Sequence, residues 1–498
     1  MRSRSRLIPA ITIGALAAML SGSALAGSSG SPGLGDPYYP TDGNGGYDVE
    51  HYDLRLTYQP STDLLSGTAT ITAVAVQNLT AFNVDFALAA SRVKVNGLNA
   101  TFTRNGDEYT ITPVLPLLPA LPFVIEVTYS DTPSKVPGSL WKKTPTGALA
   151  VNEPHIARYW FPSSDHPRDK ATYDISVAVP DDGTAVVSNG ILLGSVPERG
   201  GLKRWIWHNG SYTATYLSFL TIGKFNVETA HATRGRPFIT AFATDLAEPS
   251  LGFAKESIGK TPEIIDFLGT QFGPYPFHAE GGVVVSGLTF ALETQTRPVY
   301  GVSFFLNSTN ESVVAHESAH QWFGDHVSVD TWRNIWLNEG FATYASWLWS
   351  EHKGRGTAQQ LAVSVYNARP ENHPFWQVVV ADPGAGNEFN RAVYDRGALG
   401  IHALRVAVGD ATFFRILKAW QFDRANRTGT IEQFIALSER LARKPLKDIF
   451  NLWLFTKGRP PAPPGAAEDT DLASWTEPPS FTEIQRTHDI LAKTEYGR

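Results

Sequence analysis

Two different hydrophobic patterns divide this chain of 498 residues. From residue 47 to about residue 225, short runs of alternating and β-branched residues are separated by turn pairs such as Asn105-Gly106 and Asn209-Gly210. Many short strands with almost no helical periodicity are typical of an antiparallel β-sandwich. Beyond residue 250 apolar residues recur at helical spacing around one β segment at 282–300. They predict amphipathic helices over 251–272, 312–327, 337–350, 397–408, 411–420, 431–442 and 446–455.

The pattern therefore predicts an α+β, multidomain chain. An N-terminal antiparallel β-sandwich covers residues 47–228, and a mostly helical domain with a small sheet covers residues 229–459. Residues 27–46 are rich in Gly, Pro, Ser and Asp, and we interpret them as a linker. We interpret residues 460–498 as a Pro-rich acidic tail without clear periodicity.

The first 26 residues have the features of a secretory signal peptide. Three arginines among the first six residues precede an apolar run without acidic residues, and small residues stand at positions 24 and 26. A membrane anchor is the weaker interpretation, because the run is about 14 residues long and a bilayer span needs roughly 20. We expect cleavage after Ala26 and a secreted, extracellular mature protein.

Composition excludes several classes of function. The chain has no cysteine, which rules out disulfide scaffolds, thiolate zinc sites, iron–sulfur clusters and a cysteine nucleophile. Its 42 Lys and Arg against 48 Asp and Glu give a formal charge of -6. This balance provides no basic surface for nucleic acid or anionic lipid. We therefore expect no nucleic-acid partner, and no membrane association once the signal peptide is removed.

One cluster of residues in the helical domain has the spacing of a metal site. His316 and His320 stand four apart in a predicted helix, so both imidazoles project from the same face and can bind one metal ion. Glu317 is rotated by about 100° from His316 and suits a general base better than a third ligand. Glu339 follows His320 after 18 residues, at the start of the next helix. Two imidazoles and one carboxylate leave a tetrahedral zinc one open position for water.

The residues around this motif resemble the M1 peptidase family, the gluzincin-type zinc aminopeptidases that include alanyl aminopeptidase and leukotriene A4 hydrolase. The family pattern is His-Glu-x-x-His, 18 residues, then Glu, and the flanking residues 314–325 and 336–342 agree with the family beyond the ligands. The resemblance implies a thermolysin-like catalytic domain and one Zn²⁺ per chain. It also implies that His316, His320 and Glu339 hold the metal and that Glu317 is the general base.

A second segment resembles the family's Gly-Ala-Met-Glu-Asn strand edge. Glu293 matches the Glu that takes the free α-amine of the substrate, and Ala291 and Leu292 fall where the family binds the substrate backbone. The family's Gly and Asn are replaced here by Phe290 and Thr294.

Two more positions complete the implied substrate site. Counting back from the segment that ends in Asp165-His166-Pro167 puts Glu153 at the family's second amine-binding acid. Tyr394 falls at the family's phenol, which stabilises the oxyanion, within a segment where Arg396 replaces the usual Lys.

These features predict a secreted zinc metallo-aminopeptidase that hydrolyses the N-terminal peptide bond of peptides, with a zinc-activated water and Glu317 as general base. Its partners would be peptides with a free N-terminus, and we expect a monomer. Larger family members continue with a helical domain that closes the cleft, whereas only about 40 residues follow residue 458 here. We therefore expect a short form with an open cleft. An open-cleft zinc endopeptidase remains an alternative, as does a non-catalytic, zinc-stabilised binding protein.

Overall fold

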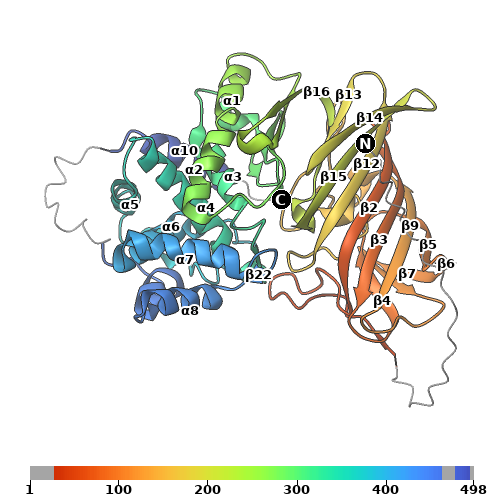
Figure 1. Cartoon of the computed structure of the whole chain (residues 1–498), viewed down its shortest axis with the longest axis horizontal. Helices are drawn as coiled ribbons and strands as arrows, with labels where there is room; N and C mark the ends of the chain where they lie inside the picture. The colour runs from red at the N-terminus through yellow and green to blue at the C-terminus, as the bar shows by residue number, and fades with distance from the viewer. Residues whose placement is uncertain (1–26, 463–476, 494–498) are drawn as a thin grey trace, which may run out of the picture.

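The computed structural model describes residues 27–462 and 477–493, so the predicted signal peptide lies outside the described residues. A β-rich N-terminal half and a helical C-terminal half lie side by side (Figure 1). The predicted α+β class is therefore confirmed. Within the described ranges, no helix combines the length and the apolar character that crossing a bilayer requires.

The N-terminal half contains an eight-stranded sheet with the order β14-β15-β12-β2-β3-β9-β5-β6. In β2, Tyr52, Leu54 and Leu56 alternate with outward-facing polar residues and are buried in the core between the sheets. The strands are β2 (Tyr47–Gln59), β3 (Leu64–Ala75), β5 (Ala90–Val95), β6 (Leu98–Asn99), β9 (Pro122–Asp131), β12 (Lys170–Pro180), β14 (Ile191–Glu198) and β15 (Leu202–Ala214).

A second, four-stranded sheet has the order β1-β4-β8-β7. Its strands are β1 (Ser28–Ser29), β4 (Leu79–Asp85), β7 (Thr101–Asn105) and β8 (Glu108–Thr112). The expectation of a purely antiparallel sandwich is wrong, because β12 pairs in parallel with β2 and β1 pairs in parallel with β4. The long excursion of the chain between β2 and β12 supplies the crossover that a parallel pair needs.

A third sheet runs from one half of the molecule into the other, with the order β10-β11-β16-β17-β18-β20-β19 and β13 beside β16. Strand β16 pairs with β11 and β13 through its first residues and with β17 from Phe225 onward. The predicted domain boundary at residue 228 therefore falls inside β16. The strands are β10 (Lys142–Lys143), β11 (Ala148–Ala150), β13 (Thr184–Val187), β16 (Leu220–His231), β17 (Pro237–Ala243), β18 (Glu280–Val285), β19 (Ala291–Leu292) and β20 (Val299–Gly301).

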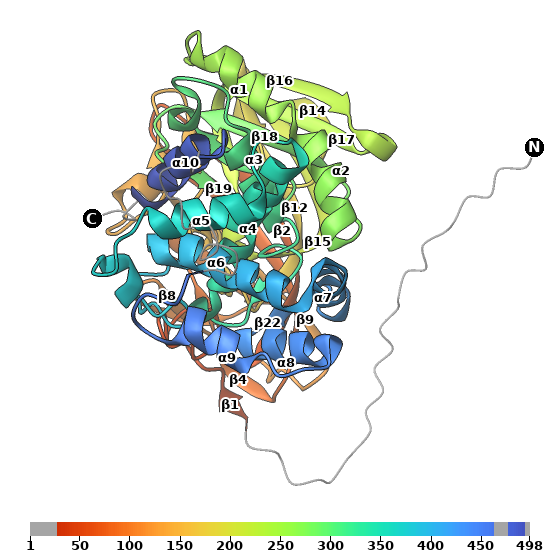
Figure 2. The same cartoon turned by 90° about the vertical axis from the view of Figure 1, so that its left-hand side faces the viewer.

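Helices form most of the second half and gather on one side of the molecule (Figure 2). They are α1 (Ser250–Ile258), α2 (Thr261–Phe272), α3 (Glu311–His320), α4 (Trp336–His352), α5 (Ala358–Asn367), α6 (Arg391–Val408), α7 (Asp410–Asp423), α8 (Ile431–Ala442), α9 (Lys447–Phe450) with the π-helical turn η8 (Asn451–Phe455), and α10 (Phe481–Lys493). A two-stranded pair joins β21 (Ser328–Val329) to β22 (Thr428–Gly429).

Two predicted helices differ from the observed ones for local reasons. The range 251–272 is two helices, because Pro262 in the first turn of α2 lacks the N–H that a continuous helix would use. Helix α3 ends at His320 and not at residue 327, and the chain turns at Gly324 with a φ of +128° that favours glycine.

The segment 27–46 is not a free linker, contrary to its composition. Buried Asp36 accepts hydrogen bonds from the Trp332 backbone N–H (2.8 Å) and lies 3.1 Å from His166, so it joins the two halves of the molecule. Asp42 accepts from the buried Arg158 guanidinium at 2.8 Å. Paired carboxylates, which a hydrophobicity pattern does not detect, fix this segment in place.

The C-terminal segment is also not a featureless tail, because residues 481–493 form helix α10. Its buried positions Ile484, Thr487, His488 and Leu491 recur at three- and four-residue spacing. Two of the four are polar, which is why the hydrophobic pattern did not predict a helix here.

Candidate active site

The predicted metal-binding histidines lie on α3, a helix buried on nearly every side. The side chain of Asn310 caps the helix by accepting from the Val313 N–H at 3.0 Å. The imidazoles of His316 and His320, one turn apart, have ring centroids 4.9 Å from each other and are about 1% exposed. The helix thus presents two nitrogens to one point, as the four-residue spacing predicts.

Glu339, in the first turn of α4, reaches the same point from the opposite side. Its Oε2 lies 3.2 Å from His316 Nε2 and 3.5 Å from His320 Nε2. Helices α4 and α6 approach closely because Gly340 and Gly397 face each other. A Cβ on Gly397 would lie only 2.5 Å from the Trp336 side chain. This contact fixes the start of α4, and with it Glu339.

These three side chains fit a zinc ion. Their ligand atoms all lie within 4.8 Å of one another. Zinc bonds of about 2.0–2.2 Å in a tetrahedron place ligand atoms roughly 3.3–3.6 Å apart, close to the distances from Glu339 to the two imidazoles. His320 Nδ1 lies 3.0 Å from the Phe323 carbonyl, which only accepts, so Nδ1 carries the proton and Nε2 keeps its lone pair for a metal.

The ionisation of the acidic side chains around the site also favours a bound cation. Burial lowers the pKa of His316 to about 4, so this imidazole is neutral at pH 7. Burial opposes the ionisation of Glu339, but the charge of His320 and the hydrogen bonds from both histidines lower its pKa to about 2. Burial likewise raises the pKa of Glu293 and Glu317. Three acidic side chains thus share one buried space, and a divalent cation bound there would favour their ionised forms.

Glu317 lies next to the proposed ligands and lines the same cavity. One of its oxygens, with one of Glu293 and one nitrogen of His320, forms a second group of atoms within 4.8 Å of one another. Its Oε1 is buried and has no hydrogen-bond partner among the described residues. A buried acceptor without a protein partner indicates a position for water or substrate.

The predicted amine-binding acids lie beside this group. Glu293 follows the edge strand β19 and accepts a hydrogen bond from the buried Tyr216 hydroxyl at 3.2 Å. Gln321, directly after α3, donates to the Glu293 carbonyl at 3.0 Å and accepts from the Thr296 N–H at 2.7 Å. The metal helix and the strand edge are therefore held in one fixed arrangement. Glu153 reaches the same cavity from the β-rich half and is 4% exposed.

Tyr394 on α6 completes the predicted set. Its ring stacks on His316 with centroids 5.9 Å apart and planes 20° apart. Burial, with the negative charge of Glu339 second, raises the pKa of Tyr394 far above its usual value. The phenol therefore stays protonated and can donate a hydrogen bond.

One small cavity brings the predicted residues together. Its walls are Glu153, Phe290, Ala291, Glu293, His316, Glu317, His320, Glu339, Tyr394 and Leu491. Leu292 is the exception, because its side chain points into the core of the β-rich half. The space left free between these side chains measures about 10 Å³, room for roughly one water molecule. Leu491 of α10 forms part of its wall.

Sequence reasoning missed Tyr216, Gln321 and Leu491. Gln321 adjoins the motif and could have been singled out as a polar residue at the end of the metal helix. No sequence signal indicated the other two. Tyr216 lies in a β-rich segment far from the motif, and Leu491 lies in the segment interpreted as a tail.

The substitution of Arg396 for the family's Lys has a structural role. The guanidinium is buried on α6 and donates only to main-chain carbonyls. Its five acceptors are the carbonyls of Trp376, Val378, Leu452, Trp453 and Thr456. Arg396 therefore ties the helix of Tyr394 to the turn η8.

Fold and site together are those of a zinc metallopeptidase. The model of the Peptidase family M1 domain matches residues 287–453, and that of the Peptidase M1 N-terminal domain matches residues 143–217. A solved two-domain M1 zinc metallopeptidase mutant bound to L-tryptophan is 30% identical, with a TM-score of 0.76, over 86% of this chain and 99% of that one. The chain belongs to the M1 peptidase family, which implies a catalytic zinc ion.

Other relatives agree with this assignment. An M1 zinc metallopeptidase mutant from Deinococcus radiodurans is 29% identical, with a TM-score of 0.78, over 86% of this chain and 99% of that one. Aminopeptidase M1-B of Oryza sativa subsp. japonica is 27% identical over 82% of this chain and 50% of that protein. Aminopeptidase N of Lactococcus lactis subsp. lactis is 26% identical over 85% of this chain and 53% of that protein. The chain thus spans about half the length of these curated relatives.

Proposed function

We propose that the protein is a secreted zinc aminopeptidase that removes the N-terminal residue from peptides. The observation that supports this most strongly is the shared cavity, in which Glu153 and Glu293 stand beside His316, His320 and Glu339. Two buried carboxylates form charge-assisted hydrogen bonds with an ammonium group better than with any neutral part of a peptide. A free α-amine bound there brings the first peptide bond to the metal ligands, which makes the enzyme an exopeptidase.

Each of the residues in the cavity has its own role in the proposed hydrolysis. A zinc ion held by His316, His320 and Glu339 would polarise the scissile carbonyl and lower the pKa of a water. The Glu317 carboxylate takes a proton from the attacking water and passes it to the leaving nitrogen. The Tyr394 hydroxyl donates a hydrogen bond to the carbonyl oxygen as negative charge develops on it. Ala291 and Leu292, at the free edge of β19, bind the substrate backbone as an added strand.

The ligands of solved relatives support this substrate class. Structures of M1 zinc metallopeptidase mutants similar to this chain are described as bound to L-arginine, to L-tryptophan and to a Tyr-Ser-Ala substrate. Each of these molecules has a free α-amine that the pair of acids can bind. Their different side chains leave the preferred N-terminal residue open.

The endopeptidase alternative is less well supported. An endopeptidase needs room for peptide on both sides of the scissile bond, whereas here Glu153 and Glu293 form one wall of the cavity. Phe290, which replaces a glycine of the family pattern, adds bulk to the same wall. The binding-protein alternative does not explain Glu317 and Tyr394, since neither is needed to hold a metal.

We include secretion in the proposal because residues 1–26 have the sequence features of a secretory signal peptide. If the signal peptide is cleaved as the sequence predicts, protein from the culture medium of its producing cells begins at Gly27. Retention in the cell with an intact N-terminus would contradict this part.

Matched substrates test the activity directly. We expect the mature protein to hydrolyse leucyl-p-nitroanilide, to lose this activity on chelation and to regain it with zinc. N-acetyl-leucyl-p-nitroanilide, which differs only in its blocked amine, should be cleaved at least about 100-fold more slowly, because two buried carboxylates are left unpaired. Equal cleavage of both substrates would favour the endopeptidase, and cleavage of neither would contradict the proposal.

A further inference from the structure

Helix α10 is bound to the start of the metal helix α3. Glu483 accepts a hydrogen bond from the Ser312 N–H at 2.9 Å, one of the N–H groups that a helix start leaves without an intrahelical partner. Thr487 exchanges hydrogen bonds of 2.9 and 3.1 Å with Asn310, the residue that caps α3. A carboxylate at this end of α3 also complements the helix dipole. Helix α10 therefore has specific contacts to the element that carries both histidines.

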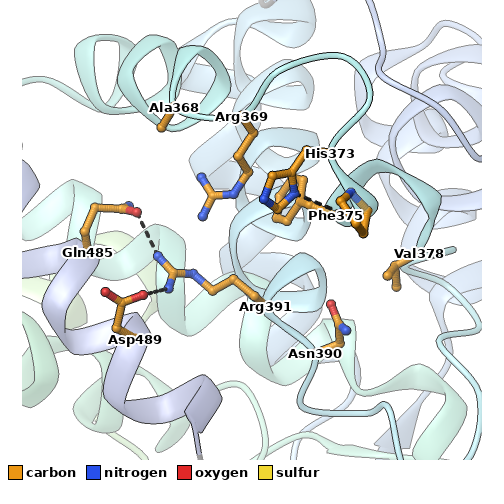
Figure 3. A pocket seen from close by; sticks show the side chains of 10 residues that line it. Ala368, Arg369, His373, Phe375, Val378, Asn390, Arg391, Gln485 and Asp489 are labelled. Carbon is orange, nitrogen blue, oxygen red and sulfur yellow. Dashed lines mark hydrogen bonds and ion pairs between the residues drawn. The ribbon is translucent and has the colours of Figure 1, made fainter.

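The same helix is bound to α6, which carries Tyr394. His488, fully buried, lies with Nδ1 2.7 Å from Asp395 Oδ1. On the outer side Arg391 donates to Gln485 at 2.8 Å and to Asp489 at 2.7 Å (Figure 3). Arg391 also pairs with Asp395 at 2.7 Å, so the two sets of contacts form one network. Helix α10 thus bridges the two helices on which the proposed chemistry depends.

The position of α10 relative to the amine site follows from its neighbours. The ring of His488 lies 6.1 Å from that of His316 and 6.4 Å from that of Tyr394. The amine-binding Glu293 instead groups with His320. Helix α10 therefore lies across the metal ligands from the amine end. In an aminopeptidase this side receives the part of the peptide beyond the scissile bond.

Leu491 is the residue of α10 that reaches the cavity. On the outer face of the same helix, Gln485 and Asp489 line a separate, larger cavity of about 540 Å³ together with Arg369 and Arg391 (Figure 3). Helices α6 and α10 contribute to the walls of both spaces. Helix α10 therefore contributes one face to the cavity at the metal ligands and the other face to this separate cavity.

We propose that α10 is a wall of the substrate site and that Leu491 limits the length of peptide beyond the scissile bond. The inference rests on the proposed aminopeptidase function and adds a substrate class, namely short peptides with few residues beyond the scissile bond. A longer peptide must displace the Leu491 side chain or the end of α10, and this displacement costs binding free energy. Leu491 is thereby a specificity-determining residue, contributed by a segment that follows the proline-rich stretch after residue 458.

The test compares peptide lengths in the full chain. The measured quantity is the ratio of kcat/KM for the hexapeptide Leu-Gly-Gly-Gly-Gly-Gly to kcat/KM for Leu-Gly. Leu491→Ala should raise this ratio by about tenfold or more, the scale set by a few methylene groups in a pocket. Leu491→Trp should lower it. Ile490→Ala is the matched control, since it removes the same number of carbons from a half-buried neighbour outside the cavity wall and should leave the ratio within about twofold.

The outcomes separate this inference from the proposed function. An unchanged ratio in a folded Leu491→Ala protein overturns the inference, provided that the wild type cleaves leucyl-p-nitroanilide. If Leu491→Ala does not fold, the Leu491→Trp protein provides the test. An unchanged ratio of kcat/KM in Leu491→Trp overturns the inference, and a reduced ratio supports it. Equal rises in Leu491→Ala and Ile490→Ala also overturn it, since loosening of α10 in general would then explain the effect. If the wild type cleaves no substrate with a free amine, the proposed function is wrong, and the inference that rests on it is wrong as well.

Discussion

Arg396 offers a sharp test of how α6 is held, since the family pattern has Lys at this position. The five N–H groups of the guanidinium face five main-chain carbonyls, and burial lowers the pKa of Arg396 to about 10. Arg396→Lys provides at most three donors, so at least two of the five carbonyls lose the hydrogen bond from this side chain. The contacts to Val378, Leu452 and Thr456 are only partly buried, so water can replace some of the lost donors. We expect the free energy of unfolding to fall by about 1–3 kcal/mol, the cost of roughly one unsatisfied buried group.

Guanidinium denaturation followed by tryptophan fluorescence measures this change. Arg440→Lys is the matched control, because Arg440 is exposed and, among the residues that the structure describes, forms an ion pair only with Asp423, at 3.0 Å. That substitution should change the free energy of unfolding by less than about 0.5 kcal/mol. If Arg396→Lys also costs less than about 1 kcal/mol, the buried carbonyls are not the reason why arginine occupies this position. Because the protein has two domains, transition midpoints should be compared as well as extrapolated free energies.

Three more predictions concern the site and its surroundings. Tyr394→Phe should lower kcat by about 10² to 10³ with little change in KM or zinc content, and a loss below tenfold would exclude an oxyanion role. Removing zinc should lower the unfolding temperature, which added zinc restores; an unchanged temperature would contradict a site that binds metal tightly. Burial lowers the pKa of Lys170 to about 7, below roughly 10.4 in the unfolded chain, so the unfolded chain binds more protons between these values and stability should rise from pH 7 to pH 10. Lys170→Met should flatten that rise in urea titrations, and an identical slope would contradict the assignment.

The metal site could be predicted from sequence because it depends on local geometry. The four-residue spacing of His316 and His320 determines their common direction once the segment is a helix, and Glu339 starts the helix that follows. Helix α8 was predicted with its observed bounds for a similar reason. A capping box at Thr430 and Gln433 marks its start, and its apolar face has the regular helical period.

The missed parts of the molecule depend on long-range polar contacts. Asp36 fixes the segment 27–46 through partners about 130 and 296 residues away, and nothing in the local sequence indicates them. Helix α10 buries Thr487 and His488 where a periodic pattern expects apolar residues. The part that Leu491 plays in the cavity wall was missed with it, because this segment was interpreted as a tail.

Glu317→Gln provides the most direct test of the proposed activity, because it removes the general base and leaves the three metal ligands in place. Zinc content, unfolding temperature and turnover of leucyl-p-nitroanilide should be measured on the same preparation. We expect one zinc per chain, an unfolding temperature near that of the wild type, and a kcat reduced by about 10² to 10⁴. Turnover within about tenfold of the wild type, with zinc bound, would contradict the central claim that Glu317 activates water at this site.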